Sequence, residues 1–322
     1  MSRRGTPATD SLKTLPSSSL LRASSVAGGK PLPLWDASEC FSISIRRYCH
    51  YGSDMNTTDA HQRPGIRIEN NSAQKVTDTL VAEGALQVVI NGERFTITMR
   101  TPGRDRELAL GLLLTEGILA ADAPLPESAH TAITDLDDSA ALNVIIPGFS
   151  SAGHERSLMS SAACGLCGKR DISDIALEKN ALAPAPTMSI KTLPRMVQDM
   201  VDRQNLFERS GGSHAAAAFS ASGEFLAFAE DVGRHNAVDK TVGQLMQDER
   251  LSDANVLLVS GRVSYEIIYK ACRAGLPFVI AVSAPSALAV RTAEKQGMTL
   301  IGFCRGSRAT IYSRADQITD ID

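Results

Sequence analysis

The chain has 322 residues, of which 43% are hydrophobic and 21% charged, a composition typical of a soluble globular protein. Its formal net charge of -3 argues against a general nucleic-acid-binding protein, which normally carries an excess of lysine and arginine. No apolar run approaches the roughly 20 residues that a membrane-spanning helix needs, so we expect no membrane association.

The six cysteines are spread widely along the chain, at Cys40, Cys49, Cys164, Cys167, Cys272 and Cys304. In a chain of this length, that spacing does not indicate the disulfide framework of a small secreted protein. We therefore expect free thiols and a reducing, cytoplasmic setting.

Residues 1–60 are rich in Ser, Thr, Pro and Arg and show no sustained hydrophobic period. They lack the apolar core and small-residue cleavage site of a secretory signal peptide, and we expect a disordered leader. The sequence leaves open whether translation starts at Met1 or Met55, because organised sequence begins soon after Met55.

Residues 61–150 predict a small α+β domain. A strand over residues 80–90, an Asn91-Gly92 turn and a return strand over 94–99 indicate a hairpin. Helical spacing of apolar residues then predicts an amphipathic helix over 105–119, before strands over 133–136 and 142–146. Residues 151–186 are expected to form a mobile Cys-x-x-Cys loop that ends in an Ala- and Pro-rich linker.

Residues 187–316 predict a larger α/β domain that begins with a helix over 190–207. Strands are expected over 214–219, 224–229, 256–259, 278–282 and 299–303, and helices over 236–247, 265–274 and 286–296. Apolar strands that alternate with helices favour a sheet that is partly parallel and covered on both faces.

Four polar loops in this domain each follow a predicted strand, at residues 230–236, 260–262, 283–286 and 304–308. In an open α/β sheet, ligands bind beyond the carboxyl ends of the parallel strands, where helix N-termini present free N–H groups to anions. Taken singly, each arginine of these loops is more typical of a solvated surface charge. Their common edge favours one anionic ligand bound by Arg234, Arg262, Arg305 and Arg308.

The sequence contains neither a Gly-x-x-x-x-Gly-Lys-Ser/Thr loop nor a Gly-x-Gly-x-x-Gly motif after a strand. An ordinary nucleotide-hydrolysing or nicotinamide-binding site is therefore not supported.

His235 and Asp239 are four residues apart, so in a helix they lie on the same face. One interpretation is that His235 acts as a general base and that the Asp239 carboxylate orients it. An alternative of equal weight is that His235 binds backbone or ligand while Asp239 stabilises the helix N-terminus. His214 is more typical of a packed or ligand-positioning residue than of a metal ligand.

The pair Cys164 and Cys167 lies among small and polar residues, which indicates an exposed loop. A zinc site is disfavoured because there is no second Cys-x-x-Cys, and a thioredoxin-like site because the pair does not lie in a βαβ unit. A third interpretation is a thiolate that carries sulfur as a persulfide, with its pKa lowered by Lys169 and Arg170. The neighbouring thiol would then assist release of the sulfur through a disulfide.

The order of motifs resembles the formate dehydrogenase accessory sulfurtransferase family (FdhD/NarQ). The motifs that carry the resemblance are at residues 101–103, 107–111, 114–117, 164–168, 214–216, 230–240, 259–262, 281–285 and 300–303, and it covers about residues 75–314. The family's large domain is similar to the cytidine deaminase fold. The resemblance thus implies a three-layer α/β/α sandwich with a smaller N-terminal α+β domain, whereas the deaminases' zinc signature is absent here.

The resemblance implies that Cys164 accepts persulfide sulfur from a cysteine desulfurase and that Cys167 is its partner. The client is the molybdenum cofactor bound by two molybdopterin guanine dinucleotides, which receives the sulfur before insertion into formate dehydrogenase; no permanently bound metal is expected. Residues 303–308 match the family's cofactor-binding loop. The residues expected to bind the cofactor are Phe303, Cys304, Arg305, Gly306, Ser307, Arg308, Gly233, Arg234, His235, Asn236, Ser260 and Arg262.

The function expected from the sequence is therefore a cytoplasmic sulfurtransferase, with cysteine desulfurase and the formate dehydrogenase catalytic subunit as partners and a homodimer as its assembly. Two alternatives stay open. One is a non-catalytic molybdenum-cofactor chaperone that binds the guanine dinucleotides through its basic loops. The other is a general thiol–disulfide oxidoreductase, which the position of the cysteine loop disfavours. The division of labour between Cys164 and Cys167 is not determined by the sequence.

Overall fold

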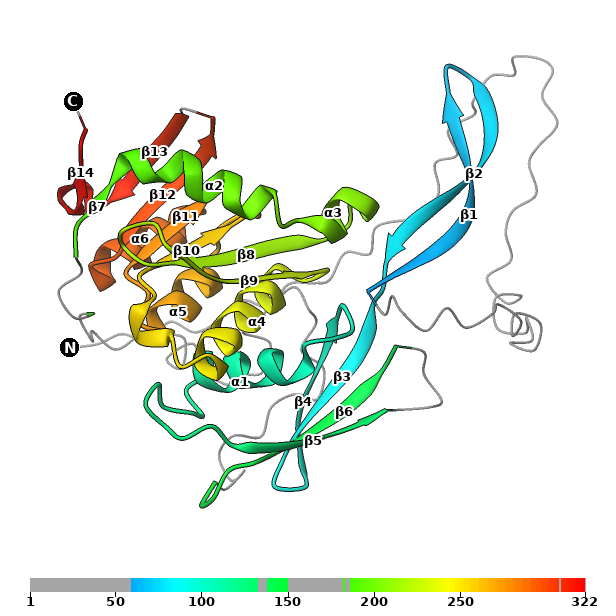
Figure 1. The fold of residues 1–322 in the computed structure, drawn as a ribbon, viewed down its shortest axis with the longest axis horizontal. Helices are drawn as coiled ribbons and strands as arrows, with labels where there is room; N and C mark the ends of the chain where they lie inside the picture. The colour runs from blue at the N-terminus through cyan, green and yellow to red at the C-terminus, as the bar shows by residue number, and fades with distance from the viewer. Residues whose placement is uncertain (1–58, 133–137, 150–181, 183–185, 307, 322) are drawn as a thin grey trace, which may run out of the picture. The chain divides into compact units, whose positions relative to one another are not determined.

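The computed structural model describes residues 59–132, 138–149, 182, 186–306 and 308–321 (Figure 1). The predicted leader over 1–60 and the cysteine loop and linker over 151–186 lie almost entirely outside the described residues, as does the strand expected over 133–136. All described residues belong to one compact unit, residues 54–322. Within the described residues, no helix is both long and apolar enough to cross a membrane.

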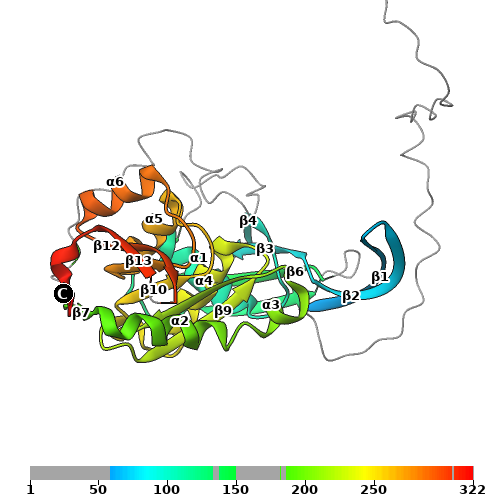
Figure 2. The ribbon, with the colours of Figure 1, turned by 90° about the horizontal axis from the view of Figure 1, so that it is seen from above.

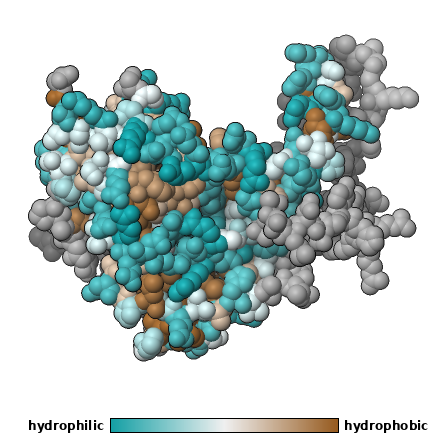
Figure 3. All heavy atoms as spheres, viewed as in Figure 1, coloured by the Kyte–Doolittle hydropathy of each residue, from teal (hydrophilic) through white to brown (hydrophobic). Residues whose placement is uncertain are grey.

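A two-stranded antiparallel arm, which the sequence did not predict, precedes the small α+β region. Strands β1 (Ala60–Glu69) and β2 (Ser72–Val81) pair along their whole length, and they turn at Asn70 and Asn71, which have φ values of 49° and 63°. The arm projects from the body in both ribbon views (Figures 1 and 2). Its Ile66 and Ile68 are 68% and 73% exposed, and apolar atoms interrupt the hydrophilic surface of the arm in Figure 3.

The small α+β region contains a four-stranded sheet of order β4-β3-β6-β5 and helix α1 (Asp105–Thr115). The predicted hairpin is confirmed: β3 (Gly84–Ile90) and β4 (Glu93–Arg100) join at Asn91 and Gly92, which both have positive φ. Strand β6 (Ala140–Ile145) overlaps the predicted strand over 142–146. Its antiparallel neighbour is β5 (Glu127–Ala132), which lies before the predicted strand over 133–136.

A six-stranded sheet of order β13-β12-β11-β10-β8-β9 forms the centre of the larger region. Its strands are β8 (His214–Phe219), β9 (Phe225–Asp231), β10 (Val256–Val259), β11 (Phe278–Ala281), β12 (Thr299–Arg305) and β13 (Arg308–Ser313). Strands β10, β11 and β12 are mutually parallel, which confirms the predicted parallel part. The sequence did not predict β13, which returns antiparallel to β12.

Helices cover both faces of this sheet, as predicted (Figures 1 and 2). The predicted helix over 190–207 is interrupted: a 3₁₀ turn (Ile190–Thr192) leads into α2 (Leu193–Val201), and α3 (Asn205–Ser210) follows separately. Side chains of α2 pack with one face of the sheet in a core that contains Met196, Phe219 and Phe278. The remaining short elements are β7 (Met188–Ser189), β14 (Ile318–Thr319), and 3₁₀ turns at Leu251–Asp253 and Ala315–Gln317.

The opposite face carries α4 (Arg234–Gln247), α5 (Tyr265–Arg273) and α6 (Ala287–Gln296), all near their predicted bounds. Gly297 closes α6 in a left-handed conformation, with a φ of 69°, as its C-terminal position predicts. The core on this face also contains Leu108, Leu113 and Val88 from the small α+β region. The two regions therefore share one core, and the mixed α/β class is confirmed.

Helix α1 packs directly against α4, and both contribute a glycine to the contact. A Cβ at Gly111 would lie 1.8 Å from the Asp239 carbonyl oxygen, and a Cβ at Gly243 would lie 1.8 Å from that of Glu107. A side chain at either position would therefore force the helix backbones apart. We call this contact, together with the end of β4 and residues 101–104 where they meet α4, the seam.

Candidate functional site

The four predicted polar loops lie at one edge of the six-stranded sheet. Strand β9 is antiparallel to β8, and β8 is antiparallel to β10, so β9, β10, β11 and β12 all end at this edge. Backbone bonds join these loops to neighbouring strands, from Ser260 N to Ala215 O of β8 at 3.0 Å and from Phe303 N of β12 to Ser283 O at 3.0 Å. We call this edge, at the ends of these strands, the carboxyl edge; its described residues are 231–236, 260–262, 283–286, 303–306 and 308.

A cationic cluster occupies the part of the carboxyl edge around His214, the first residue of β8. Burial lowers the pKa of His214 below its ordinary value of 6.5, and the positive charges of Arg234 and Arg262 lower it further, while Asp231 opposes them. A Cβ at Gly261 would lie 3.3 Å from His214 Nδ1 and 3.8 Å from Arg234 Cβ, so the two side chains meet over this glycine. The structure thus brings Arg234 and Arg262 together around one imidazole.

Two further titratable groups adjoin this cluster. His235 is buried, with 4% of its surface exposed, and Glu266 in the first turn of α5 is half-buried. Burial alone would raise the pKa of Glu266. A hydrogen bond with Ser264, a backbone bond, and the charges of His235 and Arg234 together hold that pKa below its usual range. Glu266 is therefore an anion beside the cations at neutral pH.

The expected cofactor-binding segment spans the end of β12, which includes Phe303, Cys304 and Arg305, and the first residue of β13, Arg308. Phe303, with a φ of 57°, is 38% exposed, and Arg305, Gly306 and Arg308 are also exposed. Cys304 differs from them because only 2% of its surface is exposed, and burial raises the pKa of its thiol to about 11. Cys304 is therefore a neutral packed side chain at neutral pH. Ser307 lies outside the described residues.

Hydroxyl groups at the carboxyl edge hold the backbone in place. Ser260 Oγ accepts a hydrogen bond from Ala215 N at 2.9 Å, which joins the loop after β10 to β8. Ser286 Oγ accepts one from Ala289 N at 3.1 Å and caps the N-terminus of α6. Ser260, which the sequence nominated for cofactor binding, thus has a structural partner.

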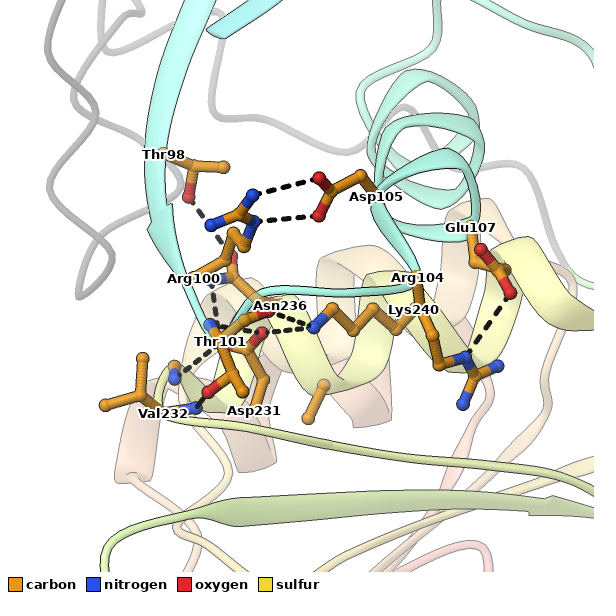
Figure 4. Close-up of polar contacts among 12 residues, drawn as sticks. Thr98, Arg100, Thr101, Arg104, Asp105, Glu107, Asp231, Val232, Asn236 and Lys240 are labelled. Atoms are coloured by element: carbon orange, nitrogen blue, oxygen red, sulfur yellow. Dashed lines mark hydrogen bonds and ion pairs between the residues drawn. The ribbon is translucent and has the colours of Figure 1, made fainter. Parts of the chain in front are cut away.

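The loop that carries Arg234 and His235 is held by the seam (Figure 4). Asp231 is fully buried, and its Oδ1 accepts bonds from Gly233 N at 2.8 Å and Asn236 Nδ2 at 3.0 Å. Asn236 also donates to the carbonyl oxygen of Met99 at 2.7 Å and accepts from Thr98 at 3.2 Å. Both residues were nominated for cofactor binding, but Asn236 is engaged between the two regions and Gly233 is bound to Asp231.

A second set of buried charges completes this contact. Lys240 Nζ lies 2.7 Å from Asp231 Oδ2 and donates to the Thr101 carbonyl oxygen at 2.8 Å. Arg100, 2% exposed, holds Asp105 through two hydrogen bonds of 2.8 and 2.9 Å. These side chains link β4, the start of α1 and α4, which positions the loop at the carboxyl edge.

Asp239 has a different role from either of the two expected from the sequence. Its carboxylate accepts bonds from Lys270 Nζ at 2.7 and 2.8 Å and from Thr115 Oγ1 at 2.9 Å, joining α4 to α5 and α1. Neither a His235–Asp239 dyad nor stabilisation of the helix N-terminus is therefore correct. Sequence reasoning did not assign a role to Lys240 or Lys270, which are both 2% exposed.

The expected catalytic residues Cys164 and Cys167 lie outside the described residues. The described chain nearest to them on either side is Phe149 and Leu182, and both pack against the core. In the described part of the chain, no group of three or more His, Cys, Asp or Glu side chains is arranged to hold a metal ion.

Comparisons with known proteins agree with these features. The model of the FdhD/NarQ family matches residues 81–319. The sulfur carrier protein FdhD of Streptomyces coelicolor is 43% identical over 269 residues, which cover 80% of this chain and 95% of that protein. The sulfur carrier protein FdhD of Saccharolobus solfataricus is 35% identical over 259 residues, 79% of this chain and 96% of that protein.

A solved structure has a similar fold. The crystal structure of a "putative formate dehydrogenase accessory protein" from Desulfotalea psychrophila matches with a TM-score of 0.62 and 17% sequence identity. The match covers 80% of this chain and 99% of that one, so nearly all of that fold has a counterpart here.

Proposed function

This chain belongs to the FdhD/NarQ family, and on that basis we propose that it is a sulfur carrier required for formate dehydrogenase activity. The observation that carries the proposal is the near full-length similarity to proteins named sulfur carrier protein FdhD, at up to 43% identity. The cysteine pair and the basic loops are the chemical groups that such a role needs, and both belong to the matched range of residues 81–319.

Loading begins at Cys164. The thiolate of Cys164 attacks the terminal sulfur of a cysteine persulfide on a cysteine desulfurase. The new S–S bond forms as the donor's S–S bond breaks, and the donor cysteine leaves as a thiolate with the electron pair. No net oxidation occurs, and the carrier now holds a persulfide.

Release uses the second thiol. Cys167 attacks Cys164 Sγ, forming an internal disulfide and expelling the outer sulfur as hydrosulfide, which the molybdenum of the client cofactor accepts. The dithiol supplies the two electrons that reduce the sulfur. A cellular dithiol must then reduce the Cys164–Cys167 disulfide before the next cycle.

The carboxyl edge holds the client during this transfer. Arg234, Arg262, Arg305 and Arg308 supply guanidinium groups for the phosphates of the two guanine dinucleotides. The proposal also includes two expectations from the sequence. The larger region has a fold like that of the cytidine deaminases, and the protein assembles as a homodimer.

Intact-mass measurement tests the loading step. The full chain is incubated with a cysteine desulfurase and cysteine, and we expect a gain of sulfur that disappears in Cys164→Ser. Cys272→Ser is the matched control, because burial raises the pKa of the half-buried Cys272 thiol and loading should be unaffected. Normal loading of Cys164→Ser would contradict the assignment, and formate dehydrogenase activity in cells with this variant would favour a chaperone role.

A further inference from the structure

A pocket of about 720 Å³ lies at the end of the six-stranded sheet opposite to the carboxyl edge. Asn255 and Pro277, which directly precede β10 and β11, belong to its wall. Its apolar lining includes Pro124, Leu125, Leu245, Met246, Ala254 and Ala274. We call it the amino-end pocket; the sulfur transfer of the proposed function does not use it.

The rim of the amino-end pocket is acidic. Asp122 and Glu249 both line it and are exposed, and no lysine, arginine or histidine is among its described lining residues. Arg250, the neighbour of Glu249 in the chain, is already paired with Glu224 and Asp253. A ligand that matches this pocket is therefore apolar, with a positive charge beside its apolar part.

The β1–β2 arm carries these two properties on one face. Ile66 pairs with Lys75 and Ile68 with Ala73, and directly opposed residues of a hairpin share a face. The isoleucines are 68% and 73% exposed, and Lys75 is exposed, with no ion partner in the described part of the chain. Because an isolated two-stranded hairpin is only marginally stable in water, a surface that covers this face would stabilise the arm.

We propose that the arm of one copy inserts Ile66 and Ile68 into the amino-end pocket of a second copy, which returns the same contact. Lys75 then lies beside Asp122 and Glu249 of the other copy, so the charges at the rim are complementary. The arrangement is closed, because each copy uses its arm and its pocket once. The inference rests on the homodimer of the proposed function and names its interface.

The arm is placed to reach another copy rather than its own pocket. A Cβ at Gly212, two residues before β8 begins at the carboxyl edge, would lie 3.0 Å from Val81 Cγ1 at the base of the arm. The pocket is at the opposite end of the same sheet, and the arm projects away from the body (Figures 1 and 2).

The area of the arm decides how two copies combine. Each strand has ten residues, so one face of the arm measures about 33 by 10 Å, or about 330 Å². Two arms stacked on each other would bury about 660 Å² in total, which is the size of a crystal contact. Two reciprocal contacts between an arm and a pocket surface would bury about twice that area, within the range of about 1,200–2,000 Å² for a stable interface.

Sedimentation velocity of the full chain over a range of concentrations tests the interface. We expect a dimer whose Kd rises at least about 100-fold in the double variant Ile66→Asp with Ile68→Asp, because both apolar side chains lose their burial. Both positions are exposed in the single chain, so the variant should fold normally. Val201→Asp is the matched control, because Val201 is a 50% exposed apolar residue on α2, and the Kd should not change.

Charge reversal tests the pairing of arm and pocket. Lys75→Glu, or Asp122→Lys with Glu249→Lys, should each raise the Kd about tenfold, because like charges then meet at the rim. A chain that carries all three substitutions should recover most of the affinity, since the charges are again complementary. Further weakening in the combined variant would overturn the pairing.

The remaining outcomes separate the interface from the proposed function. A monomeric wild-type chain would overturn both this interface and the homodimer. A dimer that the arm variant leaves intact, or assemblies that keep growing beyond a dimer, would overturn the interface alone. Sulfur loading of the wild-type chain is measured on the same sample: an arm-dependent dimer that loads no sulfur would sink the sulfur-carrier role and leave the interface standing.

Discussion

The seam and the carboxyl edge draw on the same stretch of sequence, residues 230–240, and use it differently. At the seam, Asp231 and Lys240 are buried and paired with each other, with 0% and 2% of their side-chain surfaces exposed. At the carboxyl edge, Arg262, Arg305 and Arg308 are exposed. The seam's charges find their partners within the chain, whereas the edge accumulates positive charge.

This difference shows that the residues of a long polar motif need not all contact a ligand, because some of them hold the fold together. On α4, Asn236, Asp239, Lys240 and Gly243 recur every three or four residues and so lie on the face toward α1. Arg234 precedes them at the first turn and belongs to the edge. One helix therefore anchors the two regions and presents a cation to the ligand side. Substitutions at the seam should act on stability, and those at the edge on binding.

The largest effect is expected for Lys270→Met. Removing Lys270 leaves the buried carboxylate of Asp239 without its ion partner, which should cost about 3–5 kcal/mol in the free energy of unfolding. Urea denaturation measures the loss. The double variant Lys270→Met with Asp239→Leu removes both charges and should recover most of the stability; a single variant as stable as wild type would contradict the buried pair.

Gly243→Ala should be the next most disruptive. Its Cβ would lie 1.8 Å from the Glu107 carbonyl oxygen, so α1 and α4 must separate, at a cost of about 3 kcal/mol. Gly65→Ala is the control, because the nearest atom to its Cβ would be Val76 Cγ2 at 3.8 Å. The midpoint of urea unfolding should fall for the first variant only, and equal midpoints would show that the helices do not pack this closely.

Asn236→Ala distinguishes the seam from the edge within the motif. It removes bonds to Thr98, Met99 and Asp231, and buried partners left unpaired should cost about 1–3 kcal/mol. Unfolding by urea reports this loss. If Asn236 instead contacts the ligand and contributes nothing to the seam, stability will be unchanged while the affinity for sulfate, a stand-in for the phosphate groups of the ligand, falls.

Arg262→Gln should show the opposite pattern. Arg262 is exposed, so we expect the free energy of unfolding to change by less than about 0.5 kcal/mol. Sulfate affinity should fall at least tenfold with the loss of a charged hydrogen bond. Arg195→Gln, on the other side of the sheet and 77% exposed, controls for a general change in net charge. Equal affinities for the two variants would refute the assignment of Arg262.

The smallest effect is the pH dependence of stability due to His214. Because its pKa is below 6.5 in the folded state, the unfolded chain binds more protons below that pH. The contribution of His214 to the free energy of unfolding is therefore fully present above about pH 6.5, and it is lost as the pH falls toward the folded-state pKa. His214→Gln should flatten this part of the profile, as measured by thermal unfolding across pH, whereas a steeper profile would reverse the sign argued here.

Much of the larger region could be predicted from the sequence because local pattern and burial agree there. Val256–Val259 is a short apolar run that is wholly buried between helices, and its predicted bounds match the structure. The β1–β2 arm was missed because its hydrophobic alternation is short, limited in β1 to Ile66 and Ile68, and because Pro64 lies within β1. The Asn70-Asn71 turn was the available signal. Strand β13 was missed because its residues are only partly buried on the edge of the sheet.

For the site, chain order alone placed the four loops at a common edge, because parallel strands with helical connections must end together. It could not separate Arg234, which lies near His214, from Asn236, which faces the small α+β region, since the two are only two residues apart at the start of α4. That separation depends on the position of β4, whose Thr98 and Met99 bind Asn236 and which no local pattern around Asn236 encodes. Likewise, Asp239 and Lys270 are 31 residues apart, and only the packing of α4 against α5 makes them a pair.

The sequence by itself therefore determined the alternating elements, the family and the chemical types at the edge, since these follow from periodicity and from motifs read along the chain. Tertiary structure decided which residues of the motif bind other residues of the chain at the seam and which remain available to a ligand. The physical reason is burial: Asp231, Asp239 and Lys240 must find partners once α1 and α4 exclude water from them. At the carboxyl edge, by contrast, Arg262, Arg305 and Arg308 remain exposed to solvent.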